Sequence, residues 1–128
     1  MRHLAIFVGN AIERILSGRQ TIEVRFTVDR ILPYEKIKKG DEIYLKQSGG
    51  LVLGKVIVDN VLFYENLDGE LIGKLRKEYN QDLCADDSFC QSKVNSRYAT
   101  IIFLKNPQRF LTPLRIGKRD RRSWIILK

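Results

Sequence analysis

The sequence has few of the residues that most often bind metals or carry nucleophilic catalysis. His3 is its only histidine, and its two cysteines, Cys84 and Cys90, lie in a polar stretch without a histidine nearby. A zinc site needs more ligands than these, and no Ser-His-Asp or Cys-His set is available. We therefore expect no metal and no cofactor, and a structural role for His3. The cysteines are interpreted as free thiols in a reducing cytoplasm, with a local disulfide as the alternative.

Long apolar stretches and phosphate-binding glycine motifs are also missing. No segment approaches the roughly 18 apolar residues of a membrane span, so no membrane partner is expected. The N-terminal stretch has one short apolar run and no small-residue cleavage site, unlike a secretory signal peptide. There is no G-x-G-x-x-G or P-loop motif, and Ser48-Gly49-Gly50 is typical of a hairpin turn. Asp86-Asp87 lacks the further carboxylates of a cation-binding loop.

Basic residues, in contrast, are plentiful and unevenly distributed. The 128 residues carry a net charge of +8, and positions 88–128 hold ten basic residues against one acidic residue. Positions 59–87 are acidic, with three basic and eight acidic residues. A basic segment of this density favours a polyanionic partner, most simply RNA or DNA phosphate. The alternative is a high isoelectric point without a nucleic-acid role.

Hydrophobic periodicity predicts a small α+β domain. Alternating or continuous apolar stretches indicate strands, whereas apolar residues three or four apart indicate helices. The expected helices are a short one after Asn10 and a longer one at 67–83, and the expected strands are 3–8, 21–28, 42–47, 51–64, 98–104 and 124–127. About six short strands in a single domain, 1–128, are typical of a closed or nearly closed sheet.

Individual residues mark where these elements begin, bend and end. Asn10 is expected to cap the first helix with its side chain. Gly54 predicts a bulge or bend in the long strand, and Asp59-Asn60 divides that strand in two in one interpretation. Pro107 is expected to end the strand that begins at Tyr98.

The stretch Asn10–Val28 combines a short amphipathic helix with a strand. Gly18 follows the last apolar residue of the helix, where a positive φ is commonly needed. From Thr21 the apolar period changes to two, so Glu23 and Arg25 share one face of the strand. Two opposite charges on a strand face that packs against the protein or binds a ligand suggest a binding site. A solvated surface ion pair is the alternative.

The segment GRQTIEVR, Gly18–Arg25, resembles the signature of the ASCH domain family, which reads roughly G-x-K-x-x-E-x-R. Lys39-Gly40-Asp41 matches the G-D turn before a strand in that family, and the ending Ser123–Ile126 is similar to the end of ASCH domains. The family belongs to the PUA-like superfamily of small β-barrels. The resemblance therefore implies a PUA-like barrel of about six strands with two or three helices. The sequence departs from the signature at one position, where Gln20 replaces the lysine of the family.

The resemblance also implies a site. In ASCH-like domains the signature turn lines a cleft proposed to bind RNA or a nucleobase, which would make Gly18, Gln20, Thr21, Glu23 and Arg25 the ligand-binding residues here. A carboxylate accepts a hydrogen bond from an exocyclic base amine, and an arginine pairs with carbonyl or phosphate oxygens. We therefore expect an RNA- or nucleotide-binding module.

Some small ASCH proteins hydrolyse amides of acylated cytidine with the signature lysine. A hydrolase of a modified nucleoside, or of RNA, is accordingly the alternative function, with Glu23 as general acid or base. Gln20 argues against it because an amide neither titrates nor attacks. Lys36 and Lys55 are the nearest lysines in sequence that could substitute.

The C-terminal segment is the second candidate site. We expect Lys118, Arg119, Arg121 and Arg122 to contact the backbone of a nucleic acid. Trp124 opens an apolar strand, and we expect it in the core rather than as a stacking platform for bases. A protein-interaction module whose charge only maintains solubility is the third hypothesis, and the basic tail argues against it.

Overall fold

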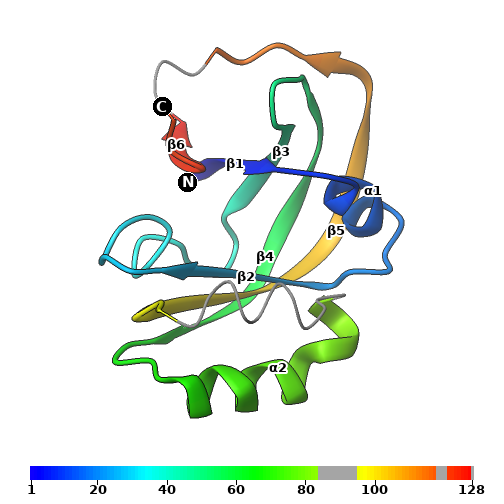
Figure 1. Ribbon diagram of the computed structural model, residues 1–128. Coiled ribbons are helices and arrows are strands. Elements are labelled where there is room, and N and C mark those ends of the chain that lie inside the picture. Colours follow the sequence, from blue (N-terminus) through cyan, green and yellow to red (C-terminus); the bar gives the residue numbers. More distant parts are fainter. Residues whose placement is uncertain (84–94, 118–120, 128) are drawn as a thin grey trace.

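The structure is a computed structural model, and it describes residues 1–83, 95–117 and 121–127 (Figure 1). Within these residues the chain forms six strands and two helices, as the periodicity predicted. Their order is β1 Arg2–Phe7, α1 Ala11–Leu16, β2 Ile22–Thr27, β3 Glu42–Gln47, β4 Val52–Tyr64, α2 Gly69–Leu83, β5 Tyr98–Leu114 and β6 Trp124–Leu127. The predicted α+β class is confirmed. None of the helices in the described part of the chain is long and apolar enough to cross a membrane.

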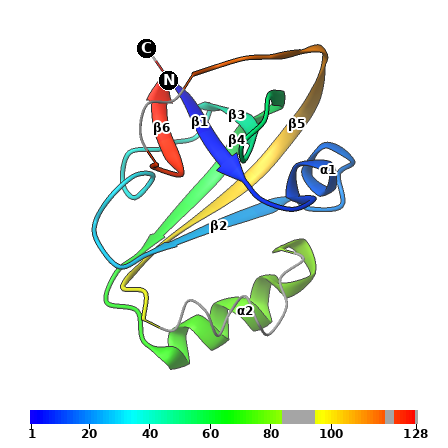
Figure 2. The same ribbon diagram turned by 45° about the horizontal axis from the view of Figure 1, so that its top comes forward.

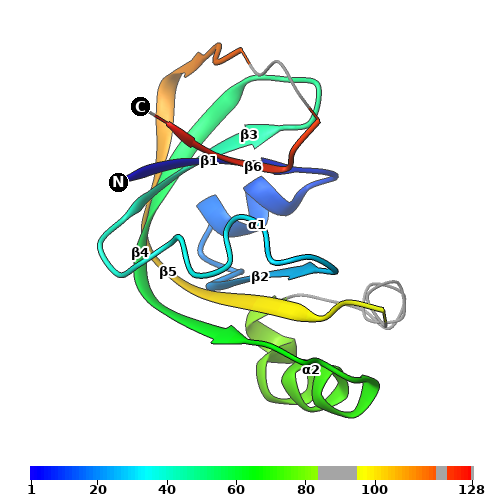
Figure 3. The same cartoon turned by 90° about the vertical axis from the view of Figure 1, so that its left-hand side faces the viewer.

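The six strands form one strongly curled sheet. Their order is β2-β5-β4-β3-β1-β6, so β2 and β6 are the two edges. β1 and β3 are parallel, and the other neighbours are antiparallel. The sheet curls into a half-barrel around α1, and β2 thereby lies across from β1 and β6 (Figures 2 and 3). The seam between these two edges is the open side of the barrel.

Two hydrophobic clusters hold the fold together. The first fills the inside of the curl, where Ile12 and Ile15 of α1 pack on the strands. The second lies between α2 and the outer face of the sheet, where Ile72 and Leu75 pack on Ile22, Val24 and neighbours. Burying a large apolar side chain of this kind stabilises a fold by about 1.5–3 kcal/mol. The two clusters place β2 between them, with one face toward each.

The expected alternation along β2 is confirmed, and the structure shows what each face meets. Ile22 and Val24 are buried beneath α2. Glu23 lies opposite Ile102, a residue of the inner cluster, so Glu23 and Arg25 point into the curl. The turn before β2 depends on Gly18, whose φ of +83° is strained for any residue with a Cβ.

The long strand β4 bends without dividing. The interpretation that Asp59-Asn60 splits it was wrong, because β4 runs unbroken from Val52 to Tyr64 and accommodates these residues with a shift of register. The bend predicted at Gly54 is confirmed by a second register shift. A Cβ at Gly54 would lie 2.4 Å from the carbonyl oxygen of Gln108 and 2.9 Å from Leu16 of α1. Glycine therefore allows β5 and α1 to approach the strand closely.

Two further sequence-based expectations were wrong. Pro107 does not end its strand, since β5 continues to Leu114. Beyond Phe103 β5 has no partner in β2, and the β4 register shifts around Pro107, so its missing N–H costs no ladder hydrogen bond. Asn10 makes no side-chain cap on the helix N-terminus, because its side-chain oxygen accepts a hydrogen bond from Arg14 instead.

Candidate ligand-binding cleft

The open seam of the half-barrel contains a cavity of about 400 Å³. β2 forms one wall, and the end of β1 together with Ser123 forms the opposite wall. Its polar lining includes Arg14, Gln20, Glu23 and Arg25. The apolar lining comes from β1, β2, α1 and the segments that follow the two strands, and it comprises Ile6, Phe7, Val8, Ala11, Val24, Phe26, Leu32 and Pro33. Cavities of this size accept small-molecule ligands.

Glu23 and Arg25 form an ion pair within this cavity. Their side chains are 14% and 16% exposed, and Arg25 Nε lies 3.6 Å from Glu23 Oε1. An ion pair this deeply buried differs from the solvated surface pair considered as an alternative. Each charge is stabilised mainly by the other charge and by nearby polar groups, because little water reaches the pair.

Arg25 spans the seam between the two edges of the sheet. Its Nη2 donates a hydrogen bond to the carbonyl oxygen of Ile6 in β1, at 3.1 Å. Its guanidinium also lies against two aromatic rings, 4.8 Å from the centroid of Phe7 and 5.2 Å from that of Trp124. Among the described atoms, Nε of Arg25 is buried without a hydrogen-bond partner. Arg25 is thus fixed by charge, by one hydrogen bond and by stacking.

Glu23 is easier to protonate than an exposed glutamate. Burial raises the pKa of its carboxyl above the ordinary value, while Arg25, Arg14 and the backbone N–H of Val24 lower it only in part. A carboxyl with a raised pKa exchanges a proton closer to neutral pH than an exposed one does. This direction suits a general acid or base, and the carboxyl can accept or donate a hydrogen bond.

Both the oxygen and the nitrogen of the Gln20 side-chain amide form hydrogen bonds. Its Oε1 accepts a hydrogen bond from Arg14 Nε at 3.2 Å, and its Nε2 donates one to the carbonyl oxygen of Ile22 at 3.0 Å. The side chain is buried at the base of the cleft. Where the ASCH signature has a lysine, this chain therefore has a neutral group that links α1 to β2.

The predicted signature residues are divided between two cavities. Gln20, Glu23 and Arg25 line the large cleft. Gly18 and Thr21 line a separate cavity of about 40 Å³, to which Gln20 also contributes. Arg14 was missed by the sequence analysis, because it reads as part of the polar face of a short helix. Its position six residues before Gln20 gave no signal that it turns toward the cleft.

The candidate lysines lie elsewhere. Lys36 is exposed, and Lys55 forms an ion pair with Glu42 at 3.2 Å; neither lines the cleft. Arg121 and Arg122 are exposed and immediately precede Ser123, which does line it. Lys118 and Arg119 fall outside the described residues, as do Cys84, Asp86-Asp87 and Cys90. Within the described residues no group of three or more His, Cys, Asp or Glu side chains gathers to hold a metal ion.

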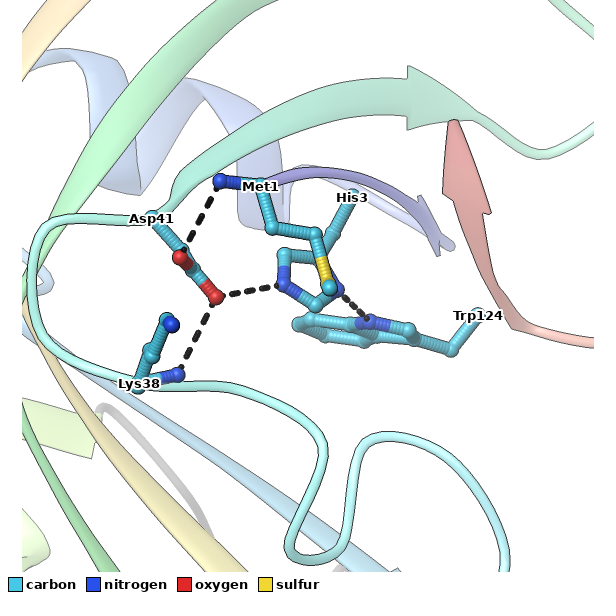
Figure 4. A network of polar contacts seen from close by, with 5 residues as sticks. All are labelled: Met1, His3, Lys38, Asp41 and Trp124. Carbon is cyan, nitrogen blue, oxygen red and sulfur yellow. Dashed lines mark hydrogen bonds and ion pairs between the residues drawn. The ribbon is translucent and has the colours of Figure 1, made fainter. Parts of the chain in front are cut away.

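His3 and Trp124 belong to a buried polar network behind the cleft (Figure 4). Trp124 Nε1 donates a hydrogen bond to His3 Nδ1 at 3.0 Å, and His3 Nε2 lies 2.9 Å from Asp41 Oδ2. Asp41 also accepts from the backbone N–H of Lys38 and from the amino group of Met1. Burial alone would raise the pKa of Asp41, but these hydrogen bonds hold it below its ordinary value. The predicted core position of Trp124 is confirmed, and His3 is fully buried beside it.

Comparisons with solved structures agree with this architecture. The crystal structure of ASCH from Zymomonas mobilis superimposes with a TM-score of 0.76 at 14% identity, over 99% of this chain and 87% of that one. A mutant form of that Zymomonas mobilis protein aligns equally well, over 90% of its chain. The hypothetical protein PH0355 superimposes with a TM-score of 0.54 at 21% identity, over 84% of this chain and 99% of that one. The chain therefore has the ASCH fold, and the expected small PUA-like barrel is confirmed.

Neither a family model nor any curated protein matches the sequence. At identities this low the superpositions show the fold alone, so the function is inferred from the residues of the cleft.

Proposed function

We propose that residues 1–128 form a single ASCH-type module of the cytoplasm that binds RNA or a nucleotide in the cleft at the seam. The observation that carries this proposal is the pairing of Glu23 with Arg25 inside a cavity of about 400 Å³. A carboxyl group and a guanidinium side by side offer both acceptors and donors to the polar edge of a base.

The lining of the cleft supports this class of ligand. Arg14 and Arg25 provide positive charge, while Phe7, Ala11 and Leu32 provide apolar surface for the faces of a base or sugar. Gln20 contributes an amide whose orientation is fixed by its two hydrogen bonds. In this proposal Gly18 and Thr21 set the shape of the turn that presents these groups.

The surface beside the cleft extends the binding site toward phosphate groups. Arg121 and Arg122 are exposed directly before Ser123 on one wall. We propose that they contact the backbone of the nucleic acid together with Lys118 and Arg119 of the same segment. Contacts of this kind strengthen binding regardless of sequence, and they weaken as salt rises.

A titration of a short fluorescein-labelled single-stranded RNA tests the proposal. We expect weak binding at low salt, a steep loss of affinity at higher salt, and competition by at least one nucleoside monophosphate that occupies the cleft. Binding that is absent at low salt, or that salt leaves unchanged, would contradict the proposal.

Hydrolysis of a modified nucleoside is the second candidate function, and the raised pKa of Glu23 is the observation that favours it. Gln20 supplies no nucleophile, and no described lysine lines the cleft. We therefore expect no amide hydrolysis of acylated cytidine. Turnover by the parent that is lost in Glu23→Gln would make the hydrolase the better description.

A further inference from the structure

His3 and Asp41 lie outside the cleft, yet they are connected to it through a continuous chain of contacts. Asp41 lies in the turn before β3, His3 is in β1, and Trp124 opens β6. The three side chains are buried and joined by two hydrogen bonds of 2.9 and 3.0 Å. The ring of Trp124 also lies 5.2 Å from the guanidinium of Arg25, which lines the cleft.

The hydrogen bonds fix the orientation of each ring. An indole N–H only donates, so Nδ1 of His3 accepts from Trp124 and carries no proton. Nε2 of His3 then carries the proton and donates to Asp41. This arrangement leaves His3 neutral and determines both the tautomer of its ring and the position of the indole.

The position of Arg25 depends on that indole. Its guanidinium lies over the rings of Phe7 and Trp124, and one hydrogen bond to Ile6 supports it from β1. Its Nε has no hydrogen-bond partner among the described atoms. With so few directional bonds, a shift of the Trp124 ring would let the guanidinium move away from Glu23.

We infer that His3 and Asp41 are positioning residues of the cleft, which hold Trp124 as the surface against which Arg25 is fixed beside Glu23. This inference rests on the proposed function for its consequence in ligand binding. Its structural part, the control of Arg25 by a network that touches no ligand, stands independently of which ligand is bound.

Two substitutions of His3 separate the bonds of the network. In His3→Asn the amide oxygen can replace Nδ1 and accept from Trp124, while the bond to Asp41 is lost. In His3→Gln the amide nitrogen can replace Nε2 and donate to Asp41, while the bond to Trp124 is lost. Trp124→Phe keeps a ring next to Arg25 but removes the N–H donor. Leu75→Ala, in the cluster beneath α2, is the matched control for a general loss of stability.

The first measurement is the NMR signal of the Arg25 Nε–H group, assigned by its loss in Arg25→Lys. Two nearby aromatic rings displace this signal from the usual arginine position. We expect it to move toward that position in His3→Gln and Trp124→Phe, and to move less in His3→Asn. In the first two variants the pKa of Glu23 should also rise further, because its nearest cation has moved away. Leu75→Ala should change neither property.

The second measurement is the affinity for the labelled single-stranded RNA, expected to fall roughly threefold to tenfold in His3→Gln and Trp124→Phe. If the variants lose stability but keep the parent's Arg25 signal and RNA affinity, the network only supports the fold and the inference is overturned. Equal disturbance by Leu75→Ala would overturn it too. If the parent binds no RNA, the proposed function fails, while the Arg25 signal still decides the positioning role.

Discussion

Two of the Glu-Arg pairs in the described part of the chain lie in opposite environments. Glu13 of α1 and Arg109 of β5 form a bidentate pair on the surface, with both side chains more than half exposed. Glu23 and Arg25 form a single, longer contact inside the cleft. Arg109 lowers the pKa of Glu13, whereas burial raises the pKa of Glu23 despite its arginine. The pKa of the carboxyl is therefore shifted in opposite directions in the two pairs, and desolvation makes the difference.

Replacing the arginine of each pair by alanine should give the largest difference in stability between the two pairs. Arg25→Ala leaves Glu23 buried without its main partner and removes the contact across the seam, so we expect a loss of roughly 3–5 kcal/mol in the free energy of unfolding. Arg109→Ala leaves Glu13 in water and should barely change the stability. Urea denaturation of the two variants and the parent measures both effects. Similar losses in the two variants would remove the distinction between the pairs.

The pH dependence of stability should differ in sign. The pKa of Glu23 is raised in the folded state, so the folded protein binds more protons and loses stability as pH rises from the ordinary value of 4.5 through the folded pKa. The pKa of Glu13 is lowered, so its contribution is present above 4.5 and is lost as pH falls through its folded pKa.

The two glutamine variants isolate these contributions. We expect Glu23→Gln to remove the loss of stability above pH 4.5, and Glu13→Gln to remove part of the loss below it. Denaturation midpoints measured across this pH range, each compared with the parent at the same pH, show the two differences. A Glu23→Gln profile parallel to that of the parent would mean that Glu23 titrates as an exposed carboxyl.

Of the two pairs, only the buried one should affect ligand binding. If Glu23 recognises a base, Glu23→Gln should weaken RNA binding by about 1–3 kcal/mol, the range of one specific base contact. Glu13→Gln removes the same charge from the surface and should not weaken binding. Equal affinity of Glu23→Gln and the parent would exclude the cleft and leave only the basic surface as the binding site.

The smallest effect is expected from the basic segment. Arg121→Ala should lower RNA affinity modestly for all sequences and reduce the dependence of log affinity on log salt by about one unit per lost phosphate contact. Titrations of two unrelated RNA sequences at several salt concentrations measure this. A loss confined to one of the sequences would assign Arg121 to base recognition instead.

The sequence predicted the helix and strand that line the cleft better than it predicted the contacts of their side chains with other parts of the chain. The period of two along β2 placed Glu23 and Arg25 on one face, because strand geometry is local. It did not show that Arg25 would reach Ile6, Phe7 and Trp124, since these contacts depend on how the sheet curls. For the same reason Arg14 was overlooked, although it is close in sequence to the signature.

The errors in the strand predictions have a related cause. Proline was read as the end of β5 because a central strand cannot lose an N–H. Whether a strand is central or at an edge depends on its neighbours, and β2 accompanies β5 only as far as Phe103. For His3 a structural role was predicted from the sequence, but the hydrogen-bond partner was not. Its structural role followed from its apolar surroundings, but its bond to Trp124, 121 residues away, could not be read from the sequence.

The pairing of β1 with β6 has a consequence for how the cleft is formed. These strands come from opposite ends of the printed sequence, and the contact of His3 with Trp124 spans 121 residues. Contacts between distant segments slow folding, because a long loop must close before they form. On a ribosome Ser123, which lines the cleft, emerges together with β6 after the other five strands. The cleft is therefore completed late, and chains that stop before Ser123 should lack part of its wall.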